Sequence, residues 1–313
     1  MVADLSMIAG SVLSPEAIVR EVVCLPSAPK VLPRLKQLLS DGNSATHEIV
    51  ALIRLDPGIA ARVLQMGNCA YFATGVRCFT VDEAVTRVGY DRVYELVAYA
   101  VASQVLVRPL DIYGIEADEL WRMSVACALA AEALAERTNQ DRNVAYTIGL
   151  LHAVGMVAID EWALQKGHPF TLKNMGFPRE AMESERALLG FTQAETGCAL
   201  LKHWGFPHSI SEPVRWQYTP RASASQARMA TLLFAAKWLR SAVCTPAGAL
   251  PPPLPEAGQL AMLGLGPVAL QAMVKDVAAR LAAVNSLLDT GEGDVVGRVR
   301  FPSQEWGGEA RRE

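Results

Sequence analysis

The chain lacks the features that mark several large classes of protein. No apolar run in its 313 residues approaches the roughly 18 residues that suggest a membrane-spanning helix. The N-terminal segment 1–6 has no basic stretch followed by an apolar one, as a secretory signal would. The formal net charge is only −3, so the excess of Lys and Arg that nucleic acid or anionic membrane demands is missing. These absences favour a cytoplasmic protein whose main partner is neither membrane nor nucleic acid.

Metal-binding side chains are also scarce. The chain has five histidines and six cysteines, and the cysteines stand at 24, 69, 78, 127, 198 and 244. None of these spacings matches Cys-x-x-Cys or another zinc pattern. We therefore interpret the cysteines as buried, reduced thiols.

What the sequence does contain is the pattern of a large helical core. Hydrophobic residues make up 51% of the chain and charged residues 19%, which fits a folded protein with a substantial interior. No segment alternates apolar and polar residues as a half-buried strand does, so we expect little or no sheet. Helices are predicted from Ser14-Pro15 to about 24, from 30 to 40, over 45–55, from Pro57, over 81–88, 91–107, 117–137, 142–165, 193–204, 208–219, 225–240 and 267–288.

Local signals fix several helix starts. Thr80 and Glu83 form a capping-box pattern, as do Thr192 and Glu195. In each box the two side chains can satisfy exposed backbone amides at the start of a helix. The stretch 246–258, by contrast, is rich in proline and predicts an extended, semi-rigid linker.

Several motifs together resemble one protein family. The first is Asp56-Pro57-Gly58-Ile59-Ala60-Ala61-Arg62-Val63-Leu64, continuing to Asn68-Cys69-Ala70-Tyr71-Phe72. The second is Leu189-Gly190-Phe191-Thr192-Gln193-Ala194-Glu195-Thr196-Gly197, continuing through Leu201 to Trp204-Gly205-Phe206-Pro207. With Leu25-Pro26-Ser27-Ala28-Pro29 and 84–89, they resemble the HDOD family, bacterial HD-related output domains. The resemblance runs from about residue 18 to 240.

The resemblance implies an all-α fold in which an N-terminal helical bundle packs on a degenerate half similar to the HD phosphohydrolases. On this basis we expect an HDOD domain over 14–245, divided into subdomains 14–110 and 111–245. A Pro-rich linker at 246–259, a C-terminal helix within 260–289 and a loose tail at 290–313 should follow.

HD enzymes hold metal ions with His and Asp side chains, and the metal generates hydroxide from bound water. In this chain the positions that the resemblance assigns to ligands have mostly lost them. They are Met123, His152, Ala153, Gln193, Gln217, Tyr218 and Lys237. A thioether, a methyl group and a lysine ammonium are poor partners for a hard divalent cation. The sequence therefore predicts no metal and no cofactor at this site.

Simpler interpretations apply to individual residues. His152 lies in an apolar segment, Gly149–Gly155, and is expected to be a core histidine bonded to backbone. Glu183 and Glu185 are expected on a solvated helix face, and His203 and His208 at the surface or in caps. Tyr71-Phe72 is a candidate interaction anchor, although packing between the subdomains explains it as well.

Three functions remain open. The first is a non-catalytic regulatory module that binds other signalling proteins, and the resemblance favours it. The second is a residual metal-dependent phosphohydrolase built from His152 with Glu195 or Asp160. The third is a nucleotide-sensing pocket without hydrolysis, lined by Met123, Gln193, Gln217 and Tyr218. The helix at 267–288 could dock on its own body, mediate self-association or hold a partner.

Overall fold

The computed structural model describes residues 7–8, 11–21, 38, 46–68, 76–89, 93, 109–167, 170–172, 179–245 and 250–289. The anchor pair Tyr71-Phe72, most of the expected helices at 30–40 and 91–107, and the tail from 290 lie outside these residues.

The described residues form an all-α protein, as predicted. The helices are α1 (Pro15–Glu21), α3 (Thr46–Arg54), α4 (Pro57–Asn68), α5 (Val81–Val88), α7 (Ala117–Thr138), α8 (Arg142–Leu150), α9 (Val154–Lys166), α10 (Arg179–Leu189), α11 (Gln193–His203), α12 (His208–Arg215), α13 (Ala227–Cys244), α14 (Ala257–Leu260), α15 (Pro267–Ala272) and α16 (Val274–Asp289). Short 3-10 turns, η1 (Asp111–Tyr113), η2 (Pro220–Ala222) and η3 (Ala261–Leu263), and the two-residue strands β1 (Met7–Ile8) and β2 (Ser11–Val12) complete the set.

The predicted helix starts are confirmed by their hydrogen bonds. Both capping boxes are formed: Thr80 with Glu83 at α5, and Thr192 with Glu195 at α11. Asp56 caps α4, because its Oδ1 accepts the Ile59 amide at 2.9 Å. Local sequence thus sets where these helices begin, before any tertiary contact is considered.

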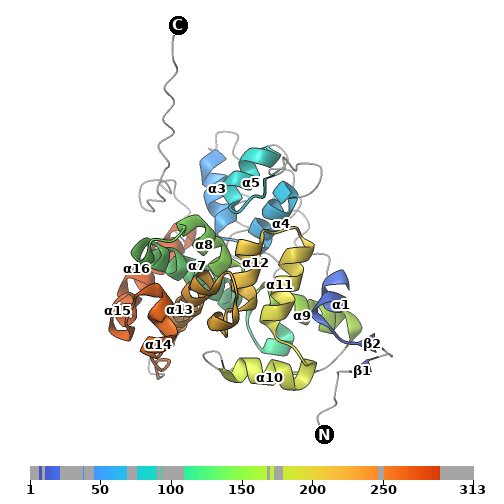
Figure 1. The fold of residues 1–313 in the computed structure, drawn as a ribbon. Coiled ribbons are helices and arrows are strands. Elements are labelled where there is room, and N and C mark those ends of the chain that lie inside the picture. The colour runs from blue at the N-terminus through green and yellow to red at the C-terminus, as the bar shows by residue number, and fades with distance from the viewer. Residues whose placement is uncertain are drawn as a thin grey trace.

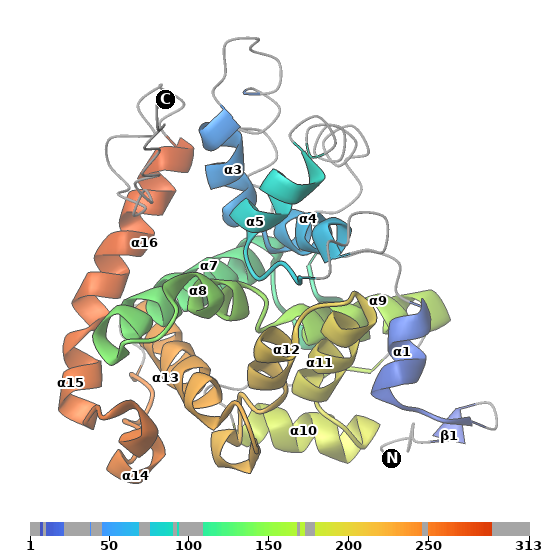
Figure 2. The ribbon, with the colours of Figure 1, turned by 45° about the horizontal axis from the view of Figure 1, so that its top comes forward.

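The helices form two groups that meet along α7 and α8. Helices α3, α4 and α5 lie on one side of this pair, and α9–α13 lie on the other (Figures 1 and 2). Helix α1 comes early in the chain but packs against α9 and α11 in the second group. The expected N-terminal subdomain, 14–110, therefore contributes one described helix to the HD-like half.

The segment 142–165, predicted as a helix or a pair of helices, is a pair, α8 and α9, separated by a turn at Leu151–Ala153. Together these helices, Arg142–Lys166, are long and apolar enough to span a membrane, but 89% of their most apolar window is buried inside the protein. They are therefore core elements. The turn places His152 and Ala153 at the start of α9, facing the interior.

The C-terminal segment docks on its own body. The predicted helix at 267–288 is broken at Met273 into α15 and α16, and α16 packs against α7 and α13 (Figure 2). Its buried contacts are Val277, Leu281 and Val284. Residues 250–256 of the expected linker run without regular structure, and Trp238 Nε1 donates to the Pro253 carbonyl at 2.8 Å. The linker's last residues instead begin α14.

Candidate functional site

A buried polar cluster lies at the centre of the HD-like half, and we call it the central cluster. Its members come from η1, the α8–α9 turn, α10, α11, the turn after α12, and α13. They are Tyr113, His152, Glu185, Gln193, Gln217, Tyr218, Lys237 and Arg240. Five of the seven predicted site residues meet here through direct contacts.

His152 is a core histidine, as predicted, because only 1% of it is exposed. Its Nδ1 lies 2.7 Å from the Gly149 carbonyl oxygen, which can only accept, so this nitrogen carries the proton. Its Nε2 then has the lone pair and accepts from the Arg240 guanidinium at 3.2 Å. Burial, together with the charges of Arg240 and Lys237, holds the pKa of His152 well below its usual value. The imidazole is therefore neutral with both nitrogens engaged.

Lys237 places its amino group in the interior. It is 4% exposed, its Nζ donates to Gln217 Oε1 at 2.8 Å, and it lies 3.7 Å from the centroid of the Tyr218 ring. The Gln217 amide in turn donates to the His152 carbonyl at 3.0 Å. Burial, and secondly the charge of Arg240, lower the pKa of Lys237 well below its usual value.

The other side of the cluster is held by Glu185. Its carboxylate accepts from the Gln193 backbone amide at 2.8 Å and from the Tyr113 hydroxyl at 3.1 Å. The Gln193 side chain donates to the Tyr218 hydroxyl at 2.9 Å, while its own Oε1 is buried without a partner. Burial raises the pKa of Glu185 to about 7, against the lowering effect of these hydrogen bonds.

Glu185 corrects the expectation of a solvated helix face. It is 2% exposed, whereas Glu183 on the same helix is exposed as expected. The reason is that Glu185 lies on the side of α10 that faces the start of α11 and η1. There the Gln193 amide and the Tyr113 hydroxyl donate to its carboxylate. His203 and His208 are exposed, as predicted.

Close helix packing positions the cluster. Gly155 on α9 lies against α11 so tightly that a Cβ there would come 1.9 Å from the Gln193 carbonyl oxygen. Only glycine permits this approach. This close contact between α9 and α11 fixes the α8–α9 turn, and therefore His152, relative to Gln193.

The residues present do not fit the metal that the HD fold implies. The lone pair of His152 Nε2 is directed at the Arg240 guanidinium, and Gln217 Oε1 accepts from Lys237 Nζ, so neither is open to a cation. Ala153 and Met123 are buried, and a methyl group and a thioether offer no hard ligand. Across the described part of the chain, no group of three His, Cys, Asp or Glu side chains is placed to hold a metal ion.

The other ligands proposed for a residual hydrolase are also engaged elsewhere. Asp160 is buried, and its Oδ1 accepts the Ile112 amide at 2.9 Å, which ties α9 to η1. The Glu195 carboxylate closes the capping box of α11.

Sequence reasoning missed Tyr113, Glu185 and Arg240. Arg240 and Lys237 stand three residues apart on a helix whose buried residues, such as Leu232 and Leu233, are otherwise mostly apolar. Two cations on one face of such a helix were an available signal. For Glu185 and Tyr113 the sequence offered no comparable signal.

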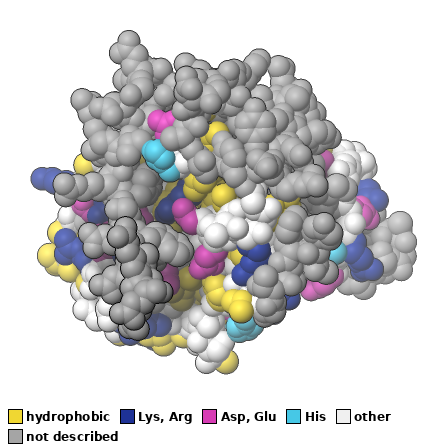
Figure 3. Space-filling view, turned by 90° about the horizontal axis from the view of Figure 1, so that it is seen from above, with side chains coloured by type: hydrophobic (Ala, Val, Ile, Leu, Met, Phe, Trp, Pro, Cys, Tyr) yellow, Lys and Arg dark blue, Asp and Glu magenta, His cyan; other side chains and the backbone are white. Residues whose placement is uncertain are grey.

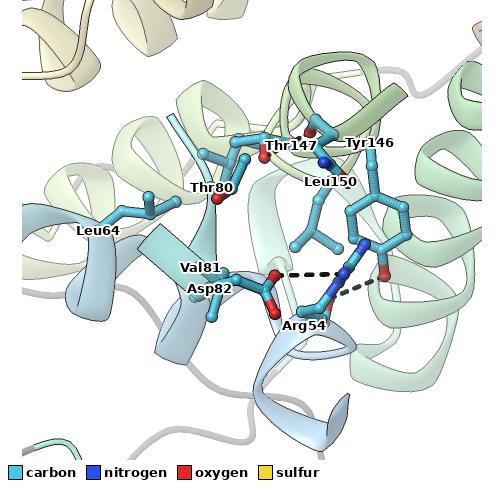
Figure 4. Close-up of a pocket in the computed structure, with 11 residues that line it drawn as sticks. Arg54, Leu64, Thr80, Val81, Asp82, Tyr146, Thr147 and Leu150 are labelled. Atoms are coloured by element: carbon cyan, nitrogen blue, oxygen red, sulfur yellow. Dashed lines mark hydrogen bonds and ion pairs between the residues drawn. The ribbon is translucent and has the colours of Figure 1, made fainter. Parts of the chain in front are cut away.

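A second polar cluster joins the two groups of helices, and we call it the subdomain joint (Figure 4). The Arg54 side chain pairs with Asp82 at 3.2 Å and lies 4.9 Å from the centroid of the Tyr146 ring. The Tyr146 hydroxyl donates to the Arg54 carbonyl at 3.0 Å, and Trp121 Nε1 donates to the Leu55 carbonyl at 3.0 Å. These bonds satisfy carbonyls at the C-terminal end of α3.

The joint borders a cavity of about 290 Å³, counting the part open to solvent, lined also by Thr80, Thr147 and Leu150. Because this cavity volume lies at the lower limit for small-molecule sites, we interpret the joint as a packing contact and not as a ligand pocket.

Comparison with solved structures shows which known proteins share the fold. The fold is similar to that of the MmoQ response regulator from Methylococcus capsulatus str. Bath, with a TM-score of 0.64 and 19% identity over 80% of this chain and 98% of that chain. It is also similar to a virulence factor from Campylobacter jejuni subsp. jejuni, with a TM-score of 0.62 and 17% identity over 86% and 100% of the two chains. At these identities the likeness shows the fold alone.

The family follows from the sequence. The HDOD domain model matches residues 25–220, more than half of the chain, so the chain belongs to the HDOD family. An uncharacterized protein of Treponema pallidum (strain Nichols) is 27% identical over 200 residues, which are 62% of this chain and 37% of that protein. The chain thus spans little more than a third of that relative's length.

Proposed function

We propose that this chain is a non-catalytic signal-transduction module that acts by contacting another protein. The observation that carries the proposal is the central cluster, where the groups at the positions that the resemblance assigns to ligands bond to one another and to Arg240. An HD-type hydrolase needs a metal to make hydroxide at neutral pH, and these residues leave it no ligands.

The surface supports a protein partner. Of six large hydrophobic side chains exposed in the described residues, four lie between 250 and 268: Leu250, Leu254, Met262 and Val268. The exposed apolar side chains of the described residues are thus concentrated in one segment, and we infer that a partner contacts it. The described side chains of the face in Figure 3 mix acidic, basic and hydrophobic groups, which does not favour nucleic acid. We place the contact, with a signalling partner or a second copy of the chain, on this segment.

Two measurements test the proposal together. Purified protein should contain no stoichiometric transition metal by elemental analysis and should not hydrolyse cyclic nucleotides with added Mn²⁺. Val268→Ser should weaken self-association in analytical ultracentrifugation, or partner recovery in affinity capture from the native cell. Leu164→Ser, at an exposed apolar position on α9, is the matched control. One tightly bound metal per chain, or equal effects of the two substitutions, would contradict the proposal.

A further inference from the structure

The C-terminal helix α16 is held to the protein by one narrow apolar stripe. It packs against α7 and α13 (Figure 2), and we call the face of α7 and α13 that it covers the helix seat. The buried side chains of the stripe recur every three or four residues: Met273, just before α16, and Val277, Leu281 and Val284. The positions between them at 275, 276, 279 and 282 are exposed. An amphipathic helix docks on a partner protein through such a stripe.

Arg280 adds a requirement for charge to this contact. Its guanidinium pairs with Glu136 at 3.1 Å and with Glu132 at 3.9 Å, both on α7, and with Asp276 of α16 itself at 3.2 Å. The Glu132 side chain is only 6% exposed, and burial raises its pKa against the lowering effect of nearby arginines, Arg280 among them. A carboxylate buried to this degree is costly without a cation. The helix seat therefore favours an occupant that carries a basic side chain at this place.

The attachment of α16 makes it separable from the rest of the fold. Residues 250–256 run without regular structure, so no continuous helix joins α13 to α16. The ion pairs of Arg280 with Glu136 and Asp276 are partly exposed, and such pairs add little stability. The helix seat belongs to the hydrophobic core, however, so it does not remain bare in water. Release of α16 therefore requires a second helix of the same pattern to take its place.

We propose that the helix seat is a binding site for an amphipathic helix of a partner protein, and that α16 occupies it as an intrachain competitor. The partner helix has the chemistry of α16, with apolar side chains every three or four residues and a basic residue that faces Glu132 and Glu136. This charge complementarity makes the basic residue the selective feature. The inference rests on the proposed function, in that the chain acts by contacting another protein, but its surface is the face of α7 and α13 rather than 250–268.

A fluorescent peptide of residues 267–289 is the probe, and its anisotropy on titration with the full chain measures binding. The native chain should bind it weakly, because α16 occupies the helix seat. The Arg280→Gln chain should bind it about tenfold more tightly, because weaker docking of α16 raises the fraction of open seats. A peptide that itself carries Arg280→Gln should bind that chain about tenfold more weakly than the native peptide does. Lys275→Gln is the matched control in chain and peptide, because Lys275 is an exposed cation on the same helix, and it should change neither affinity.

Equal peptide affinity of the native and Arg280→Gln chains, or equal affinity of the two peptides, would overturn the proposal. If Arg280→Gln does not fold, judged by its thermal unfolding, hydrogen exchange of the native chain gives the second measurement. The amides of α16 should exchange about tenfold faster than those of α7, and equal protection also counts against the proposal. A native dimer that the peptide dissociates would assign the helix seat to a second copy and contradict a separate partner. If the inference fails while Val268→Ser still weakens partner recovery, the proposed function stands without it.

Discussion

The central cluster is buried, whereas the ion pair of the subdomain joint reaches the surface through Asp82, and the two differ in how they accommodate charge. In the subdomain joint, Arg54 pairs directly with Asp82, and the nearby Arg142 pairs with Glu136 at 2.6 Å. In the central cluster, Lys237, Arg240 and Glu185 are each bonded to neutral groups. The joint therefore contains a direct ion pair, whereas in the central cluster burial shifts the pKa values of Lys237 and Glu185 toward their neutral forms.

The largest expected difference between the two regions lies in the helix packing around them. Gly155→Ala should destabilise the protein by about 3 kcal/mol or more. Its Cβ would lie 1.9 Å from the Gln193 carbonyl oxygen, and a backbone atom cannot move away as the end of a flexible side chain can. Gly67→Ala, on α4 of the other group, would meet the Ala84 Cβ at 2.9 Å and gain helix propensity, so we expect a loss of about 1 kcal/mol. Urea unfolding of both variants measures the difference. Equal losses would mean that the central helices pack no more rigidly than the others.

An intermediate effect is expected from Glu185→Gln, and it should depend on pH. The pKa of Glu185 is raised from 4.5 to about 7 in the folded protein, so the folded state binds this proton more tightly than the unfolded state. The resulting stabilisation is fully present below pH 4.5 and is lost as pH rises through 7. A neutral glutamine avoids that loss. The substitution should be close to neutral at pH 5 and should stabilise the protein by about 1–3 kcal/mol at pH 8.

Glu183→Gln, at an exposed position on the same helix, should show no such trend. Urea unfolding at pH 5, 6.5 and 8 provides the test. A stability change for Glu185→Gln that is the same at pH 5 and pH 8 would show that this carboxylate is paired as those of the joint are.

The contrast between the clusters also explains what the sequence could reveal. The capping boxes at Thr80 and Thr192 depend on neighbours three residues away, so the sequence predicts them and the structure confirms them. The family motifs then predict the fold. The sequence predicts Glu185 on a solvated face, which is wrong, because its burial depends on Tyr113, 72 residues away in the sequence.

The contact of Arg240 with His152 spans 88 residues, so the spacing of Lys237 and Arg240 on α13 indicates a polar face but not the residue that it contacts. The substituted ligand positions could be named from the resemblance, but the way their side chains bond to one another could not.

The smallest and most direct comparison removes one tyrosine hydroxyl from each cluster. Tyr146→Phe loses a hydrogen bond to the neutral Arg54 carbonyl and keeps the ring under the guanidinium, so it should cost about 1 kcal/mol at every pH. Tyr113→Phe loses a hydrogen bond to a carboxyl group whose pKa is about 7. Because hydrogen bonds to charged groups are stronger, its cost should rise from about 1 kcal/mol at pH 5 to about 2 kcal/mol at pH 8.

Paired urea unfolding of the two variants across this range measures that divergence of about 1 kcal/mol. Burial raises the pKa of both tyrosines, so neither hydroxyl ionises in the window and the carboxylate alone is responsible for the trend. Parallel pH profiles would mean that the Glu185 charge is already neutralised within the fold. The central cluster would then differ from the subdomain joint in its residues but not in its electrostatics.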